Sequence, residues 1–133
     1  MTIVGLPDAA VQESRERVQT AIKNAGLHFP RHRIVVNLAP APVRKEGPAY
    51  DLPIALGILL ASGEFEADIS GSVFYGELSL DGSVRHTNAI LPLAFMAKEH
   101  HLKKLFIPAK HQRRWDLTAR RSSRGISCLH PVR

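Results

Sequence analysis

The sequence predicts an α/β (α+β) fold in which helices and strands form a two-layer sandwich. Stretches with helical and with strand periodicity alternate along the 133 residues, as is typical of mixed domains. The pair Asp81-Gly82 stands between two short β-prone runs, as in a hairpin. The run 52–61 is apolar on nearly every side, which predicts a helix buried against a sheet. One domain fits this length and the 44% apolar content.

The first elements follow from the residues that begin and end them. Residues 2–4 predict the end of a strand, Asp8 begins a helix, and Gly26 ends that helix. Residues 33–38 predict a buried strand that stops at a proline-rich stretch. The helix is expected to bury a stripe made of Val11, Val18, Ala21, Ile22 and Ala25.

The remaining elements are predicted in the same way. A polar loop over 44–50 leads to Asp51, which we expect to cap a second helix that Gly63 ends. The glycine-containing pair Asp81-Gly82 favours a type I′ turn. Its flanking strands are residues 73–78 and 84–85, followed by a helix over 91–101, a strand over 105–107 that stops at Pro108, and a last strand over 126–129.

Positive charge is concentrated near the C-terminus. Residues 103–133 hold nine Lys or Arg against Asp116 alone, a net charge of +8, which leaves −2 for residues 1–102. Such a segment can bind nucleic acid through its phosphates, or it can be a solvated end of the chain. Trp115 is the only Phe, Tyr or Trp after Phe106, so a set of stacking rings is absent from the sequence there.

Composition favours a cytoplasmic protein. The sequence has no apolar run long enough for a membrane span, and residues 1–8 lack the features of a signal peptide. Cys128 is the only cysteine, so an internal disulfide is impossible. The seven histidines form no metal-ligand pattern, and we expect no metal site.

Three stretches in a fixed order resemble one protein family. They are Ile3-Val4-Gly5-Leu6-Pro7-Asp8 with residues 13–18, then residues 36–40 through Lys45-Glu46-Gly47 to 51–57, then Gly76-Glu77-Leu78-Ser79-Leu80-Asp81-Gly82. Together they are similar to the Lon-protease-like, ChlI-type domain that precedes the ATPase module in the magnesium-chelatase-like AAA+ competence proteins. The resemblance implies the fold of ribosomal protein S5 domain 2, as in the Lon protease domain. It covers about residues 3–110. We therefore expect a domain core over residues 1–110, followed by a basic segment over 111–133 that can end in the closing strand.

A more distant similarity to Lon implies that the peptidase dyad is lost. Lon-type peptidases carry Lys-Asp-Gly-Pro-Ser-Ala-Gly with serine as the nucleophile, and the matching run here has Ala49 at that position. The Lon base is a lysine at a fixed distance after Gly-Glu-Ile-Thr-Leu-x-Gly, where this chain has Leu93. A methyl group cannot attack a carbonyl, and an isobutyl group cannot accept a proton. The chain alone is therefore expected not to be an enzyme.

The resemblance also implies partners and cofactors. No Gly-x-x-x-x-Gly-Lys-Ser/Thr phosphate loop occurs in the sequence, so we expect no cofactor in this chain, and ATP and magnesium only in an attached ATPase module. The implied partners are that module, DNA during uptake and recombination, and further copies of the parent in a ring, with no membrane. Family relatives begin upstream with another strand, so we expect this chain to be trimmed.

The candidate contact residues are charged. Arg44, Lys45 and Glu46 lie on the loop that corresponds to the rim of the Lon active site, where they can contact nucleic acid, a partner subunit or the ATPase ring. Alternatively, Lys45 and Glu46 only bond the loop backbone. Further candidates in the basic segment are Arg113, Arg114, Arg120 and Arg121.

Two other charged groups receive a structural interpretation. Glu13, Arg15, Glu16 and Arg17 predict a solvated ion-pair face on the first helix, or alternatively a contact with a neighbouring protomer. Glu77 is expected to form hydrogen bonds within the fold rather than to act in catalysis.

Overall fold

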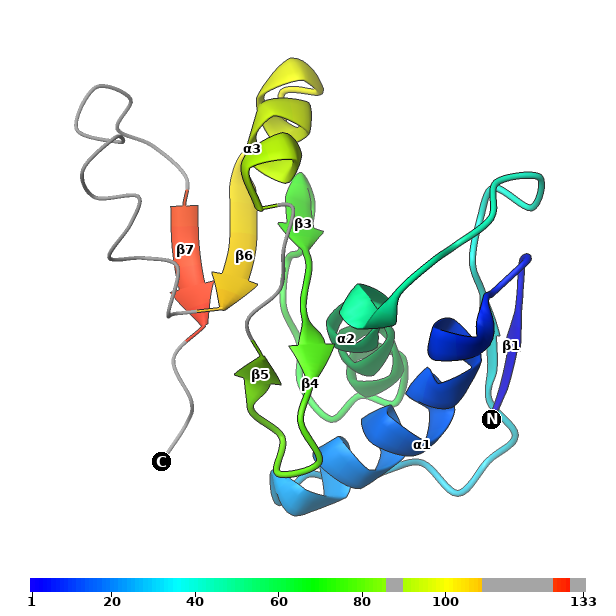
Figure 1. Cartoon of the computed structure of the whole chain (residues 1–133). Helices are drawn as coiled ribbons and strands as arrows, with labels where there is room; N and C mark the ends of the chain where they lie inside the picture. The colour runs from blue at the N-terminus through cyan, green and yellow to red at the C-terminus, as the bar shows by residue number, and fades with distance from the viewer. Residues whose placement is uncertain (86–89, 109–125, 130–133) are drawn as a thin grey trace.

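In the computed structural model of the chain, residues 1–85, 90–108 and 126–129 are described. Figure 1 shows α1 and α2 side by side, with strands on both sides of the pair. The elements, in chain order, are β1 (Thr2–Val4), α1 (Ala9–Asn24), β2 (Val35–Asn37), the 3-10 turn η1 (Pro48–Tyr50), α2 (Asp51–Ala61), β3 (Ser72–Phe74), β4 (Glu77–Leu78), β5 (Val84–Arg85), α3 (Ile90–Glu99), β6 (Lys104–Pro108) and β7 (Ile126–Leu129).

The strands form three small sheets in the described part of the chain. β1 pairs with β2 in parallel, β3, β6 and β7 form a parallel sheet in the order β3-β6-β7, and β4 pairs with β5 antiparallel. The parallel neighbours β1 and β2 are joined through α1, and β3 and β6 are joined through β4, β5 and α3. The predicted mixed α/β class is confirmed, including the last strand at Ile126–Leu129.

Asp8 and Gly26 begin and end α1, as predicted. The Asp8 side chain accepts a hydrogen bond from the Val11 amide at 2.8 Å, which satisfies a free donor of the first turn. At the other end Gly26 has a φ of 78°, and its amide bonds the Lys23 carbonyl. One position of the predicted stripe was wrong, because Ala25 lies beyond the last helical residue and is exposed.

The predicted strand over 33–38 is shorter and less buried than expected. Only Val35–Asn37 pair, and Val35 is 57% exposed. The reason is that β2 belongs to a two-stranded sheet that packs on the helices through one face, where Ile3 of β1 is buried.

The hairpin is present, but its turn differs from the type I′ prediction. A type I′ turn needs a positive φ at both central residues, and among the described non-glycine residues only Leu6 and His101 have one. The Gly82 amide donates to the Ser79 carbonyl and the Ser79 amide to the Ser83 carbonyl. This is a three-residue loop with a type I turn followed by a left-handed glycine.

The predicted strand over 73–78 is interrupted at Gly76. Its amide donates to the Ala49 carbonyl and its carbonyl accepts from the Leu52 amide, so the backbone leaves one sheet to bind the start of α2. A Cβ at this position would lie 2.5 Å from the Val84 side chain. The interruption explains why β3 and β4 belong to different sheets.

Strand β3 borders two hydrophobic cores. Phe74 packs against the main core, which α1 and α2 dominate, and its ring stacks on Phe106 with centroids 4.6 Å apart. Val73 and Tyr75 face a smaller core under α3, in which Ile107 is 1% exposed. The alternating sides of one strand therefore serve both cores.

Candidate functional site

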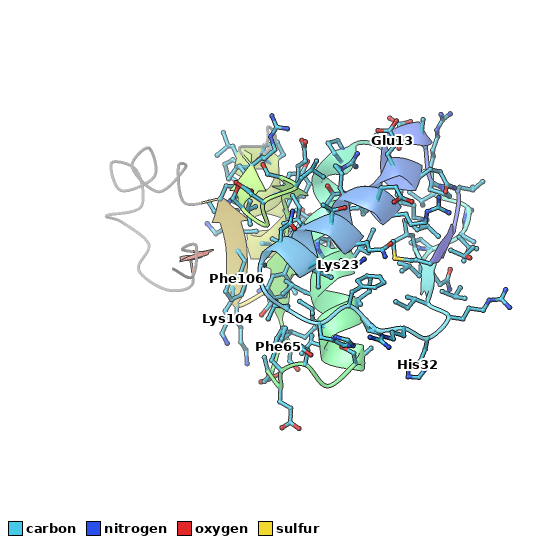
Figure 2. All side chains as sticks on the ribbon, turned by 90° about the horizontal axis from the view of Figure 1, so that it is seen from below. Glu13, Lys23, His32, Phe65, Lys104 and Phe106 are labelled. Atoms are coloured by element: carbon cyan, nitrogen blue, oxygen red, sulfur yellow. The ribbon has the colours of Figure 1, made fainter. Side chains whose placement is uncertain are left out.

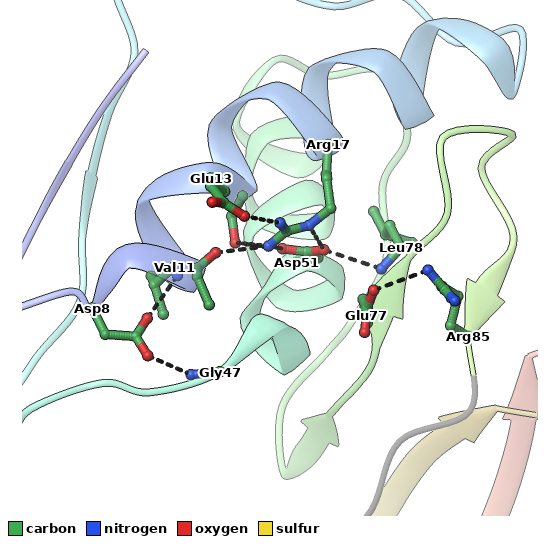
Figure 3. Close-up of polar contacts among 11 residues, drawn as sticks. Asp8, Val11, Glu13, Arg17, Gly47, Asp51, Glu77, Leu78 and Arg85 are labelled. Carbon is green, nitrogen blue, oxygen red and sulfur yellow. Dashed lines mark hydrogen bonds and ion pairs between the residues drawn. The ribbon is translucent and has the colours of Figure 1, made fainter.

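A buried carboxylate lies where α1, α2 and β4 meet. Asp51, the first residue of α2, is completely buried. It accepts hydrogen bonds from the Ser14 hydroxyl, from Arg17 Nε at 2.8 Å and from the Leu78 amide at 3.2 Å (Figure 3). The prediction that Asp51 caps its own helix was wrong: Tyr50 holds the cap position without a side-chain bond. The carboxylate turns instead toward the donors on α1 and β4.

Arg17 is the counter-ion of this carboxylate. Its Nη2 donates to the Ala10 carbonyl at 2.7 Å and its Nη1 to Glu13 at 3.3 Å. Its side chain is 19% exposed, so the prediction of a solvated ion-pair face was wrong for this residue. The hydrogen bond to Asp51 raises the pKa of the guanidinium above its usual value, against the effect of burial. The Arg17–Asp51 ion pair joins α1 to α2.

Asp8 connects the start of α1 to the loop before α2. One carboxylate oxygen accepts from the Val11 amide, and the other accepts from the Gly47 amide at 3.0 Å. The bond from Val11, and then that from Gly47, lower the pKa of this carboxyl below its usual range. Asp8 thereby fixes the beginning of η1 relative to α1 (Figure 3).

The loop candidates separate into exposed and buried residues. Arg44 and Glu46 are about 70% exposed and form an ion pair of 3.4 Å. Lys45 is 3% exposed, and its ammonium donates to the Pro40 carbonyl while its backbone pairs with Leu6 and Asp8. This placement of Lys45 fits a role in bonding the loop backbone better than a role in contacting a partner.

Contact with a partner remains a prediction for Arg44 and Glu46. The other candidates, Arg113, Arg114, Arg120 and Arg121, lie outside the described residues.

The residue that the resemblance to Lon predicts at the nucleophile position, Ala49, is buried. Ala49 lies in η1 with 6% exposure, and its carbonyl accepts from the Gly76 amide at 3.1 Å. Leu93, which the same resemblance predicts at the position of the Lon base, lies half-buried on α3. The nearby Ser14 is completely buried and bonded to Asp51, so a substrate cannot reach its hydroxyl.

Glu77 bonds within the fold, as predicted. It lies opposite Arg85 in the β4–β5 ladder, and the two side chains form an ion pair of 3.3 Å. Within the described residues, no three His, Cys, Asp or Glu side chains form a group that could hold a metal ion.

Similar proteins identify the family to which this chain belongs. The family description "Subunit ChlI of Mg-chelatase" matches residues 1–111. The chain belongs to this ChlI family. Competence protein ComM of Haemophilus influenzae is 43% identical to the ChlI-type chain over 107 residues, which are 80% of this chain and 21% of ComM. Protein YifB of Salmonella typhimurium is 48% identical over 86 residues, 64% of this chain and 17% of YifB.

Lon itself is a more distant relative. Lon protease 2 of Bacillus subtilis is 29% identical over 99 residues, 74% of this chain and 18% of that protein. The ChlI-type chain thus spans about a fifth of the length of the curated relatives it matches. No helix in the described ranges has both the length and the apolar character for crossing a membrane.

Sequence reasoning did not find the cluster of Ser14, Arg17 and Asp51. A signal was present, because Ser14 falls between Val11 and Val18 on the buried stripe, where a hydroxyl needs a partner. A polar residue on an apolar stripe and an acidic residue just before an apolar helix together indicate a buried polar contact.

Proposed function

We propose that this chain is a non-catalytic accessory domain of a magnesium-chelatase-like AAA+ protein that processes DNA in competence or recombination. The observation that supports its non-catalytic role is the buried methyl group of Ala49 at the position that corresponds to the Lon nucleophile. Glu77 and Lys45 are both engaged in structural bonds. The arrangement favours a scaffold that presents surfaces to other domains.

The fold that we assign to this role is that of ribosomal protein S5 domain 2, in which helices form one layer and strands the other. In the structure the described strands instead form three separate sheets on both sides of α1 and α2 (Figure 1). The support for the assignment is the family match and the two parallel strand pairs whose connections contain helices. An experimental structure of the full-length parent tests this assignment, because it should show the described strands in one continuous layer.

The lost peptidase activity is tested with casein. We expect the purified chain to release no peptides above the buffer control. If degradation is detected, Lys45→Met and Glu77→Gln variants identify its source: degradation that persists comes from a contaminant. Degradation that both substitutions abolish, in variants that keep the wild-type circular dichroism spectrum, would contradict the proposal.

The proposed partners are an ATPase module of the same parent, further copies in a ring, and DNA, all in the cytoplasm. ATP and magnesium would be bound by that module. The proposal expects an in-frame continuation of the coding sequence with a Gly-x-x-x-x-Gly-Lys-Ser/Thr run. A source locus that lacks any such continuation would argue against it.

The second candidate is a nucleic-acid-binding module that acts through residues 103–133. It is favoured by their net charge of +8, and Lys103 and Lys104 at its beginning are exposed. If this segment binds, truncation after Ile107 abolishes binding and salt weakens binding steeply. If the body binds through Arg44, Arg44→Ala weakens binding and the truncation does not. If the chain binds neither single- nor double-stranded DNA at low salt, both the binding through residues 103–133 and the binding through Arg44 are contradicted.

A further inference from the structure

A long stretch of the chain contains no carboxylate. Between Glu16 and Glu46 the sequence has no Asp or Glu, yet it has Arg17, Lys23, Arg31, Arg33, Arg44 and Lys45. Residues 1–102 carry a net charge of −2, so this positively charged stretch has the opposite sign to the region that contains it. Arg17 and Lys45 are bonded within the fold, which leaves the other cations at the surface.

Part of this stretch surrounds an open hollow. The end of α1 and the segment that follows it line a shallow depression of about 730 Å³, and four exposed basic residues lie around it: Lys23, His28, Arg31 and His32. In Figure 2, which is seen from below, this segment crosses the face turned toward the viewer. Arg33 is exposed next to the hollow in sequence. We call these five residues the basic hollow.

The Lys and Arg side chains of the basic hollow form no ion pairs within the described part of the chain. Lys23, Arg31 and Arg33 form no ion pair with any described residue. The carboxylate that bonds this segment is Glu64, which accepts from the His28 amide at 3.0 Å. The C-terminal end of α1 adds about half a negative charge, but the Gly26 and Leu27 amides already bond its carbonyls. Three full positive charges against the one Glu64 carboxylate therefore leave a net positive charge at this surface.

The shape and residue types favour a phosphate chain over other anions. A site for a small molecule normally encloses most of its ligand, whereas these cations are all exposed around an open depression. Phe29 is half-buried and packs against the main core, so it does not offer a free ring for stacking. Guanidinium groups match phosphate oxygens well. Contacts of this kind neutralise a backbone without reading bases.

We propose that the basic hollow binds the sugar-phosphate backbone of nucleic acid without sequence preference. This inference rests on the proposed role in DNA processing, and it assigns the contact to a surface distinct from Arg44 and from the basic C-terminal segment.

The test is a titration of labelled 30-nucleotide single- and double-stranded DNA, followed by fluorescence anisotropy, with the full chain and the variant Lys23→Ala/Arg31→Ala. Each lost phosphate contact should weaken binding roughly tenfold at about 50 mM salt, and should lower the salt slope by about one. The matched control, Arg15→Ala/Lys98→Ala, removes the same charge from exposed positions on α1 and α3. It should keep binding near the wild-type value.

Several outcomes would overturn the inference. Equal weakening in the control would show that only net charge matters. Wild-type affinity in the Lys23/Arg31 variant, with binding weakened instead by Arg113→Ala/Arg114→Ala in the full chain, would place the contact in the basic segment and leave the DNA role intact. Displacement of the DNA by an equimolar mononucleotide or acidic peptide would indicate a different ligand. A wild-type chain that binds no DNA would instead remove the DNA role itself.

Discussion

The Asp51 carboxylate links α2 to both α1 and β4. An isolated buried carboxylate is strongly unfavourable, and this one is tolerated because donors from two other elements surround it. Ser14 and Arg17 approach from α1 and the Leu78 amide from β4. A single side chain thereby fixes the position of α2 relative to both neighbours.

Replacing Asp51 by Asn should destabilise the chain by about 3 kcal/mol, because the Arg17 guanidinium would stay largely buried without its counter-ion. Urea unfolding monitored by circular dichroism measures this loss. The matched control is Glu13→Gln, which removes the exposed partner of the same arginine and should cost only about 0.3 kcal/mol. Equal losses in both variants would show that burial of the Asp51 pair does not matter.

Asp8 should make stability depend on pH. Its pKa in the folded chain is lowered by the Val11 and Gly47 amides, so its stabilising contribution is present above the unfolded value of 3.8. That contribution is lost as the pH falls through the folded pKa. Asp8→Asn should therefore be less stable than wild type near neutral pH, and the difference should shrink on acidification. Denaturant unfolding of both proteins across this pH range measures the effect; a constant difference would contradict it.

At the level of elements, sequence patterns predicted what depends on local chemistry. Asp8 and Gly26 bound α1 because a cap and a left-handed glycine act within one turn. The type of the Asp81-Gly82 turn was missed, because the loop closes through Ser79 and Ser83 outside that pair. The role of Asp51 was missed because its partners lie 34 and 37 residues away. Periodicity places Ser14 on the buried stripe of α1, but it does not identify a partner that lies so far along the chain.

Two glycines should respond in opposite ways to alanine. Gly5, after β1, has a φ of 104°, and an added Cβ would lie 2.2 Å from the Leu38 carbonyl oxygen. Gly5→Ala should therefore cost at least about 2 kcal/mol. Gly57 lies on the exposed side of α2, where a Cβ would have no neighbouring atom within 4 Å, so Gly57→Ala should stabilise by about 0.5–1 kcal/mol. Thermal unfolding of the two variants provides the comparison, and destabilisation by Gly57→Ala would show that α2 tolerates no added methyl there.

At the scale of the whole chain, the two hydrophobic cores meet along β3. The main core contains most of the buried residues of α1 and α2, whereas the smaller one consists of Ile90, Leu105 and Ile107 with a few half-buried neighbours. Segments with fewer buried apolar contacts open at lower free energy. The part that contains α3 and β6 should therefore open first.

The variant Ile107→Ala tests this separation. It should destabilise the smaller core by about 2–4 kcal/mol. Hydrogen exchange followed by mass spectrometry should show faster exchange in β3 and β6, with little change in α1 and α2. Uniform acceleration across all elements would show that the two cores unfold as one unit. The matched control, Ile22→Ala in the main core, should accelerate exchange in α1 and α2.

The contacts of Asp51 also predict which residues should change together during evolution. Because its partners Ser14 and Arg17 belong to another helix, a substitution at any one of these three codons leaves the other two poorly matched. A lineage that replaces Asp51 with an apolar residue should gain fitness when Arg17 and Ser14 become apolar as well, since a well-packed apolar trio can substitute for a buried ion pair. The three positions should therefore tend to change together among descendants, although they are far apart in the gene.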